Sequence, residues 1–488
     1  MSHKKFAQDA GIIGITQIFV SIGSILLLPI ITKTLGPYDY GVWAQISVTI
    51  ALLFPIALMG LQMTLVRFLA AEKDQARIRE GFFSILFFIF FTSLLLSVTI
   101  FLLSDILAAS VFQDINTAYL IKAGSFLILL TAMNQIVVFY FRTFRQIKTY
   151  ASLILINNIV QLLLVLYLLW LGLGILGVII ASVLIQLLVL IIALIKIRNQ
   201  IGFFIPQFTF IKEYLKFGAP LMPNTIIRWI TNSSDKYVVG YFLGLTAVGI
   251  YSASYAIGNL ITFLTSPLQV ILFPEVSRLY SEGKIDEVKK RLRYSMKYFL
   301  LLGIPAVFGL TVLSKPILQI LTTPEFEVGA PIIPFIALSA LLAGIFQIVI
   351  NITLLCKQTH YNVLIQSAAA FSNLILNIAL IPFLGLLGAA VSNLISFFVM
   401  AVLSIYVSFK FLKFDFEIKF IIKSIFASIV MSCIILLINP VTIWGLILVI
   451  CVGIIIYFTL IILTKCLDQS ELKILQELIF ERFNAFLK

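Results

Sequence analysis

Long runs of hydrophobic residues, separated by short polar segments, extend along almost the whole chain. The first run reaches from Gly11 to Ile31, and the last ends near Thr464. Runs of about 20 residues are long enough to cross a hydrocarbon core of about 30 Å as helices, because each helical residue adds about 1.5 Å. Segments that alternate polar and apolar residues are absent, so the pattern predicts a helical bundle and not a β-barrel.

The runs predict fourteen transmembrane helices. The first follows Lys4 and Lys5 in the manner of a signal peptide, but it is too long for the core of one and lacks a small-residue cleavage site, so we expect it to be retained. The predicted spans are residues 11–33, 42–69, 82–104, 119–141, 151–171, 175–196, 219–240, 248–273, 294–313, 331–355, 362–382, 388–409, 421–438 and 444–464.

Composition supports an integral membrane protein. Hydrophobic residues make up 61% of the 488 residues and charged residues only 11%, with a mean hydropathy of +1.13, whereas soluble domains carry about 25% charged residues. The net charge of +13 does not indicate a nucleic-acid partner, because most of the 34 Lys and Arg residues fall in short turns between spans. By the positive-inside rule these turns are cytoplasmic, and both termini are predicted on that side.

Two motifs recur in the second half of the chain. "LGPYDYGVW" at residues 35–43 matches "LGLTAVGIY" at residues 243–251, and "LGILG" at residues 173–177 matches "LGLLG" at residues 384–388. The repeat displaces an even number of spans, six, so both copies enter the membrane in the same orientation. We therefore predict two lobes related by a pseudo-twofold axis along the membrane normal, with the substrate path between them.

This repeat divides the chain. We predict an N-terminal six-helix lobe at residues 1–205, a C-terminal six-helix lobe at residues 206–412, transmembrane helices 13 and 14 at residues 413–465, and a cytoplasmic tail at residues 466–488. The polar segment from Lys196 to Gly218 is predicted to link the lobes. In the tail, Asp468 is placed as an N-cap with Glu471 three residues later, which predicts an amphipathic helix on the membrane surface.

The seventh span carries the clearest candidate site. Arg228 lies about nine residues, or roughly 13 Å, into this span, where a charge costs about 3 kcal/mol or more. Asp235 follows two helical turns later on nearly the same face, and Asn224 and Asn232 add polar groups to that stripe. Two interpretations remain: these groups line a central cavity, which we favour, or an Arg228 to Asp235 pair holds two spans together.

Other polar residues in or beside the spans are less specific. Arg67 closes the second span and either follows the positive-inside rule or contacts a phosphate, and Lys236 is expected to extend outward along the membrane. Pro220 and Pro223 are expected to bend the inner end of the seventh span. Several amides either line the cavity or, as we favour, bond between helices: Gln17, Gln45, Gln62, Asn157, Asn158, Asn373 and Asn377.

Sequence signatures of catalysis are absent. The chain has no Walker A loop, no GxSxG and no HExxH motif. The four cysteines and two histidines have no metal-ligand spacing. We therefore predict neither an enzyme nor a metal or cofactor site, and the residues do not indicate whether H⁺ or Na⁺ drives transport.

Three segments resemble a known family. These are "LGPYDYGVWAQ" after the first span, "VRFLAA" closing the second, and "NSSDKYVVGYFLGLTAVGIYSAS" at residues 232–254. They are similar to the polysaccharide biosynthesis transporters, the Wzx-type O-antigen and exopolysaccharide repeat-unit flippases of the MOP superfamily. The resemblance implies a MATE-like fold with two lobes in a V, alternating access, and movement of polyprenyl-diphosphate-linked oligosaccharides from the inner to the outer leaflet of the cell membrane.

The resemblance also suggests roles and partners. Arg228 would offset the charge of the diphosphate, while Trp229, Tyr251, Tyr255, Asn224 and Asn232 would contact sugars. Besides membrane lipids and the lipid-linked substrate, the implied partners are the polysaccharide polymerase and glycosyltransferases of the same pathway. The alternatives are a lipid II flippase, a cation-coupled multidrug exporter of the MATE branch, and a membrane polymerase, which would need a larger outer loop than this chain offers.

Overall fold

The described part of the chain is helical throughout. The computed structural model describes residues 3–438 and 440–466, and all the regular elements in these ranges are α-helices or short 3₁₀ helices. This confirms the predicted all-α class. The predicted amphipathic tail, apart from its first residue, lies outside the described residues.

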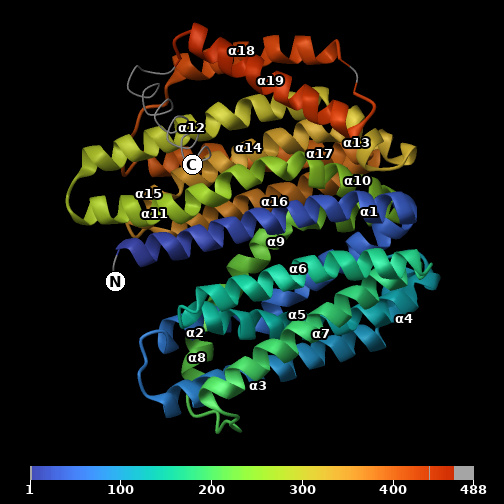
Figure 1. Ribbon diagram of the computed structural model, residues 1–488, viewed down its shortest axis with the longest axis vertical. Coiled ribbons are helices and arrows are strands. Elements are labelled where there is room, and N and C mark those ends of the chain that lie inside the picture. Colours follow the sequence, from blue (N-terminus) through green and yellow to red (C-terminus); the bar gives the residue numbers. More distant parts are fainter. Residues whose placement is uncertain (1–2, 439, 467–488) are drawn as a thin grey trace, which may run out of the picture. The chain divides into compact units, whose positions relative to one another are not determined.

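The chain forms two compact units, which we describe separately (Figure 1). The first comprises Met1–Ala256, Leu321–Ile332 and Val363–Val399. It contains α1 (His3–Leu58), α2 (Leu61–Leu69), α3 (Gln75–Leu102), α4 (Ser104–Ser110), η1 (Ile115–Thr117), α5 (Ala118–Thr143), α6 (Ile147–Trp170), α7 (Gly174–Ile201), α8 (Ile211–Gly218), η2 (Ala219–Leu221), α9 (Met222–Leu243), η4 (Pro324–Ile332) and most of α10 (Leu245–Gly258), α16 (Thr359–Leu384) and α17 (Leu386–Ser408).

The second unit comprises Ile257–Ile320, Ile333–Asn362 and Met400–Lys488. Its described elements are η3 (Asn259–Leu264), α11 (Thr265–Ser281), α12 (Ile285–Val312), α13 (Ser314–Leu321), α14 (Ile333–Val349), α15 (Asn351–Leu355), α18 (Ile418–Leu436) and α19 (Ile443–Leu463). The division into lobes at residues 1–205 and 206–412 stays a prediction.

The described residues contain 12 helices long and apolar enough to cross a membrane. The difference from the fourteen predicted spans arises at two places. The first two predicted spans form the single element α1, which is two helices joined across a non-helical Gly36. The seventh predicted span, α9, is too polar to count among the 12. The exact number of spans stays a prediction.

The recurring motifs have matching backbone conformations. Gly36 has φ 74° and its counterpart Gly244 has φ 82°. In the second motif pair, Gly174 has φ 54° and Gly385 has φ 58°. A side chain is unfavourable at such positive φ angles, so glycine is needed at each turn. The agreement supports the sequence repeat at the level of the backbone.

The first motif pair also forms a close helix crossing inside the first unit. A Cβ atom placed on Gly41 would lie 1.9 Å from the carbonyl oxygen of Leu245, and one placed on Gly249 would lie 1.9 Å from that of Pro37. The contact is reciprocal, as expected where two copies of one motif meet about a local twofold axis. Gly41 and Gly249 therefore let the backbones of α1 and α10 touch.

Hydrophobic packing joins the central helices of the first unit. The largest described core there includes Phe82 of α3, Ile136 of α5 and Ile185 of α7, all fully buried. The α3 helix begins at a capped end, because the Asp74 carboxylate accepts a hydrogen bond from the Ala76 N–H. These helices form a rigid frame next to α1 and α2.

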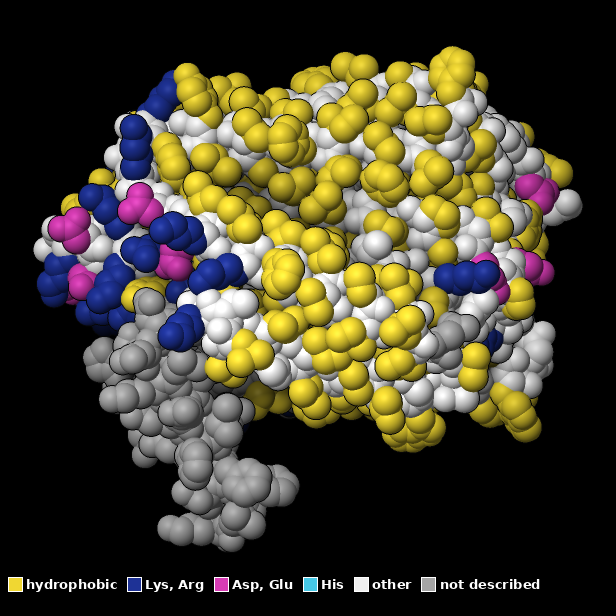
Figure 2. Space-filling view, turned by 90° about the horizontal axis from the view of Figure 1, so that it is seen from above, with side chains coloured by type: hydrophobic (Ala, Val, Ile, Leu, Met, Phe, Trp, Pro, Cys, Tyr) yellow, Lys and Arg dark blue, Asp and Glu magenta, His cyan; other side chains and the backbone are white. Residues whose placement is uncertain are grey.

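Apolar side chains also cover the outside of the protein. Figure 2 shows the face seen from above the view of Figure 1, on the side where α18 and α19 are labelled. Hydrophobic side chains spread over this face, while Lys and Arg side chains gather at one edge of it. On α19 alone, Trp444, Ile447, Leu448 and Ile455 are exposed. Such a surface is unfavourable in water and suits hydrocarbon. The helices and this surface define a multi-pass membrane protein.

An ion-paired carboxylate joins α12 to the start of α18 in the second unit. The Glu417 carboxylate lies 2.8 Å from Nε of Arg293 and 3.1 Å from Nζ of Lys297, which is 2% exposed. Burial tends to raise the pKa of Glu417, but the hydrogen bonds and charges of Lys297 and Arg293 outweigh it and hold the pKa below its ordinary value.

The lowered pKa of Glu417 predicts a pH-dependent contribution to stability. The contribution is complete above the ordinary pKa of 4.5 and is lost as the pH falls through the lower folded-state value. We expect Glu417→Gln to destabilise the protein by about 1–2 kcal/mol at pH 7. In thermal unfolding, the difference from the wild type should shrink below pH 4.5. A difference that stays constant with pH, or that Glu287→Gln reproduces, would contradict this role.

Two predicted local features take a more detailed form in the structure. The predicted linker from Lys196 to Gly218 is partly helical, since α7 continues to Ile201 and α8 begins at Ile211. Pro220 and Pro223, which we expected to bend the inner end of the seventh span, lie in the first turn of η2 and of α9, where α8 gives way to α9. Proline is compatible with that position because its missing N–H would have no helical partner there.

Candidate functional site

The α9 helix carries two groups of polar side chains. Asn224, Arg228 and Asn232 lie in its first three turns, and Ser234, Asp235 and Lys236 follow in the next. The first group is partly or fully exposed, whereas the second is buried. The helix therefore presents an accessible polar region and an internal one.

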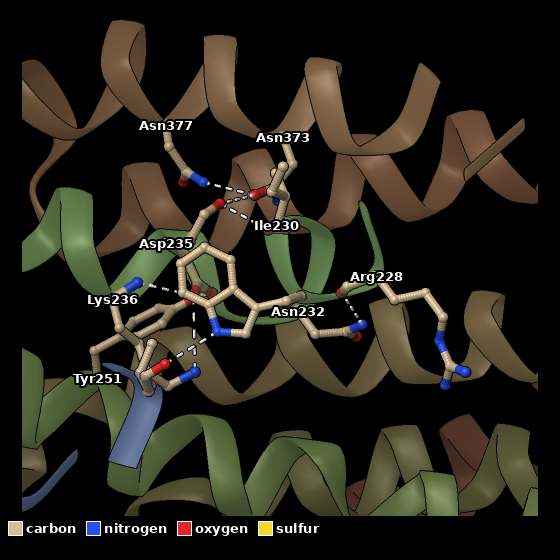
Figure 3. A network of polar contacts seen from close by, with 11 residues as sticks. Arg228, Ile230, Asn232, Asp235, Lys236, Tyr251, Asn373 and Asn377 are labelled. Carbon is tan, nitrogen blue, oxygen red and sulfur yellow. Dashed lines mark hydrogen bonds and ion pairs between the residues drawn. The ribbon is translucent and has the colours of Figure 1, made fainter. Parts of the chain in front are cut away.

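Asp235 is the centre of the internal group (Figure 3). Its carboxylate is completely buried and accepts hydrogen bonds from the Lys236 N–H at 2.8 Å and from the Tyr251 hydroxyl at 2.6 Å. Tyr251 belongs to α10, so the carboxylate connects two consecutive helices. A buried carboxylate needs such partners, because its removal from water is costly.

We expected the Lys236 side chain to extend outward, but in the structure it does not. The residue is only 9% exposed, and its Nζ lies 3.7 Å from Oδ1 of Asp235 and 4.3 Å from the centre of the Tyr255 ring. Its long side chain turns back to the neighbouring carboxylate, while α10 provides an aromatic face. The prediction was wrong because α10, which follows the turn at Gly244, lies beside α9 and covers Lys236.

Arg228 and Asp235 do not form the ion pair that we considered. In Figure 3 the Arg228 side chain points away from Asp235, whose charged partner is Lys236. Arg228 is exposed, and its backbone carbonyl accepts a hydrogen bond from Asn232 Nδ2 at 2.6 Å. Within the described ranges the guanidinium of Arg228 has neither a hydrogen bond nor an ion pair. Its charge is thus available to a ligand.

Trp229 docks α9 on α1. Its Nε1–H donates to the Val48 carbonyl at 3.1 Å, and its ring meets that of Tyr237 edge to face at 5.6 Å. The Tyr237 hydroxyl in turn lies 2.6 Å from Oγ1 of Thr49. These contacts hold the first group of α9 against a fixed neighbour.

The remaining candidate site residues from the sequence differ in their exposure to solvent. Tyr251 is fully buried, whereas Tyr255 is only partly buried and stacks under Lys236. Asn224 is half-buried, and its Oδ1 has no hydrogen-bond partner. Arg67 is exposed in the last turn of α2, and none of the described contacts connects it with α9. The structure therefore brings Asp235 and Tyr255 together through Lys236, and leaves Arg67 apart.

Some predicted amides bond between helices. Asn373 of α16 accepts a hydrogen bond from Ser234 at 3.3 Å and another from Asn377 at 2.8 Å. Gln62 of α2 accepts one from Gln135 of α5 at 3.2 Å. For Asn373 and Gln62 the interhelical role that we favoured is confirmed.

The internal group keeps unused hydrogen-bonding capacity. Nδ2 of Asn373, Oδ1 of Asn377 and both polar atoms of the fully buried Gln45 have no protein partner. Gln45 lies close to α9, because a Cβ placed on Gly240 would be 3.6 Å from its Oε1. Buried polar atoms normally have partners, so these atoms can satisfy a bound polar group or water.

The pairing of Lys236 with Asp235 was not predicted from the sequence. The signal was an acidic residue followed directly by a basic one inside a predicted span, since neither charge is stable alone in hydrocarbon. Aromatic residues at positions 251 and 255 were a second signal, because their spacing of four places both on one helical face. Together they indicate a neutralised pair, which leaves Arg228 as the net cation of α9.

Comparison with solved structures identifies the fold. The chain has the fold of the MOP transporters: a lipid II flippase MurJ in an inward closed conformation superimposes with a TM-score of 0.74 at 19% identity, over 91% of this chain and 97% of that one. An outward-facing MATE family multidrug resistance transporter superimposes with a TM-score of 0.60 at 15% identity, over 83% of this chain and 95% of that one.

The chain belongs to the polysaccharide biosynthesis protein family, whose model matches residues 30–331. The model of the lipid II flippase MurJ matches residues 245–456. Both the predicted family resemblance and the predicted MATE-like fold are thus confirmed.

Curated relatives carry names from glycan biosynthesis. The chain is 26% identical over 211 residues to the probable low-salt glycan biosynthesis flippase Agl15 of Haloferax volcanii, which covers 42% of this chain and 45% of that protein. It is 23% identical over 317 residues to the succinoglycan biosynthesis transport protein ExoT of Rhizobium meliloti, covering 64% of this chain and 61% of that protein. The chain thus spans less than two thirds of the length of either relative.

Proposed function

We propose that this protein is a flippase that moves a polyprenyl-diphosphate-linked oligosaccharide from the inner to the outer leaflet of the cell membrane by alternating access. The family, the names of Agl15 and ExoT, and the MOP fold support this activity. The observation that carries it is the unpaired guanidinium of Arg228 on a helix whose other charges neutralise each other. Such a cation in a membrane protein suits an anionic substrate group.

Arg228 binds the diphosphate or an acidic sugar in this proposal. A guanidinium forms charge-assisted, often bidentate hydrogen bonds with phosphate oxygens and offsets their desolvation. Asn224, Asn232, Trp229 and Tyr255 are proposed to contact the sugars. Asp235 orders α9 through Lys236 and Tyr251, or couples transport to a cation.

The proposal includes a topology and partners. Both termini are placed in the cytoplasm, since the Lys- and Arg-rich turns then follow the positive-inside rule. Arg67, which closes α2 and lies apart from α9, is proposed to contact a phosphate of the substrate on the cytoplasmic side, before the substrate reaches Arg228. The protein acts as a transporter without catalysis, and receives its substrate from glycosyltransferases and delivers it to a polysaccharide polymerase of the same pathway.

Replacing Arg228 by alanine tests the function. We expect export of surface polysaccharide to fall about 10- to 100-fold, the equivalent of 1.5–3 kcal/mol for a lost charged hydrogen bond. Export is measured in cells that lack the gene and carry each variant, with immunoblots of the membrane fraction to confirm equal amounts of protein. Arg228→Lys should retain part of the activity, because it keeps the charge.

The control and the alternatives are tested in the same cells. Lys212→Ala, which removes an exposed cation from α8, should leave export unchanged. Normal export by Arg228→Ala would exclude the proposed role of this residue. Altered drug susceptibility with intact surface glycans would favour the MATE-type exporter, and arrested peptidoglycan synthesis would favour the lipid II flippase.

A further inference from the structure

A cavity lies within the first unit, between α3, α5 and α7. Its volume is about 480 Å³, within the range of roughly 300–1,000 Å³ found for small-molecule sites. Its lining is apolar except for one arginine, and consists of Phe83, Leu86, Phe87, Phe90, Met133, Ile191, Leu194, Ile195, Ile197, Arg198 and Phe203. None of these residues belongs to the candidate site on α9.

The cavity is elongated along the helices. On α3 its lining runs from Phe83 to Phe90, and on α7 from Arg198 back to Ile191. Seven residues of helix span about 10 Å, which is roughly a third of the thickness of a hydrocarbon core. The rim is open to the surroundings, because Ile195 is 54% exposed and Phe203 is 63% exposed. The shape suits a hydrocarbon chain that enters from the bilayer.

The segment after α7 forms a fixed wall at one end. The buried Glu80 carboxylate accepts hydrogen bonds from the N–H groups of Gln207 at 3.1 Å and Thr209 at 3.2 Å, which fastens residues 202–210 to α3. Phe203 then meets the ring of Phe83 edge to face at 5.6 Å. This end of the cavity is therefore preformed in the absence of a ligand.

One guanidinium group lines this end of the cavity, and a second lies beside the segment that closes it. Arg198 lines the cavity, and a Cβ placed on Gly202 would lie 3.7 Å from Cζ of Arg79. Nε of Arg79 is buried without a hydrogen-bond partner. In the ranges that the structure describes, neither guanidinium has an ion pair, whereas Arg77 on the same helix pairs with Glu72 at 3.7 Å. The negative charge of Glu80 is already satisfied by the N–H groups of the wall.

We propose that this cavity binds an anionic phospholipid of the surrounding bilayer. The phosphate lies between Arg198 and Arg79, and one acyl chain follows α3 and α7 from Phe83 toward Phe90. An apolar slot with unpaired guanidinium groups at one end matches the charge and polarity of such an amphiphile. Binding adds contacts to the segment of residues 202–210, which Glu80 already holds on α3, so the lipid further stabilises the connection between α7 and α8. This inference is independent of the transported substrate.

Lipid binding to the purified full-length protein tests the proposal. Phosphatidylglycerol and phosphatidylcholine are titrated into detergent-solubilised protein, and bound lipid is counted by native mass spectrometry alongside thermal unfolding. We expect one phosphatidylglycerol to bind at least tenfold more tightly than phosphatidylcholine and to raise the unfolding temperature. Arg79→Ala with Arg198→Ala should remove this preference. Arg77→Ala, a cation that already has a partner, should retain it.

A cavity-filling variant separates loss of the site from loss of the fold. Ile195→Trp places a larger side chain at the exposed rim and should block the acyl chain, so that phosphatidylglycerol no longer raises the unfolding temperature. Leu187→Trp, an exposed position on α7 outside the cavity, should behave as the wild type. Equal binding of both lipids, or unchanged binding in the double arginine variant, would overturn the proposal. Tighter binding of a polyprenyl phosphate than of phosphatidylglycerol would also overturn it and identify the carrier lipid as the occupant.

Discussion

Replacing Asp235 by alanine is expected to destabilise the protein by about 3–5 kcal/mol, the typical effect of breaking a buried ion pair by removing one partner. The substitution leaves the ammonium group of Lys236, which is 9% exposed, without its carboxylate, and the Tyr251 hydroxyl without its acceptor. Thermal or denaturant unfolding of the purified variant in detergent measures the loss.

Two further variants separate the charge pair from the rest of the network. The double variant Asp235→Ala with Lys236→Ala should be more stable than Asp235→Ala alone, because it contains no uncompensated charge. Asp105→Ala removes a partner of the exposed pair with Lys122, where the atoms are 3.1 Å apart, and should cost less than about 1 kcal/mol. Lys236→Ala is measured as well. If the loss of unfolding free energy in the double variant equals the sum of the losses in the two single variants, Asp235 and Lys236 are not coupled.

Substituting either glycine of the crossing between α1 and α10 is expected to have the second large effect. A methyl group on Gly41 would lie 1.9 Å from the Leu245 carbonyl oxygen, and one on Gly249 would lie as close to that of Pro37. Since backbone atoms cannot rotate away, the helices must separate. We expect Gly41→Ala and Gly249→Ala each to destabilise the protein by about 1–3 kcal/mol or more and to reduce the proposed export of polysaccharide.

The matched control is a helical glycine with free space. Gly309 of α12 has no neighbouring atom within 4 Å of an added Cβ, so Gly309→Ala should be neutral or stabilising by up to about 1 kcal/mol through its higher helix propensity. All three variants are compared by thermal unfolding and by the surface-polysaccharide assay. Equal behaviour of Gly249→Ala and Gly309→Ala would show that the crossing does not need a glycine.

The fold was largely predictable because its signal is local. A run such as Gly11 to Ile31 indicates a helix by its length and hydropathy, without reference to the rest of the chain. The turn at Gly36 was equally visible, since glycine is needed where φ is positive. The number of spans was less predictable, because the polar and charged residues of α9, which are the candidate site residues, keep it from being counted among the 12 apolar helices.

The candidate site was only partly predictable. The position of Arg228 within a span marked it as a candidate without any tertiary information. Its distance along the helix from Asp235 also suggested an ion pair, which the structure does not contain. That error arose because spacing along one helix says nothing about the neighbouring helix, and here α10 brings Tyr251 and Tyr255 to the carboxylate and to Lys236.

By itself, the sequence determined that this is a helical membrane protein with recurring motifs, and it marked Arg228 as a candidate binding residue, because hydropathy, length and charge are properties of each segment. Only the tertiary structure decided that Lys236 pairs with Asp235, that Gly41 meets Gly249, and that Arg198 lines an apolar cavity between α3, α5 and α7. Each of these depends on which helices lie side by side. Pair energies fall steeply with distance, so a residue's role follows from neighbours that are remote along the chain.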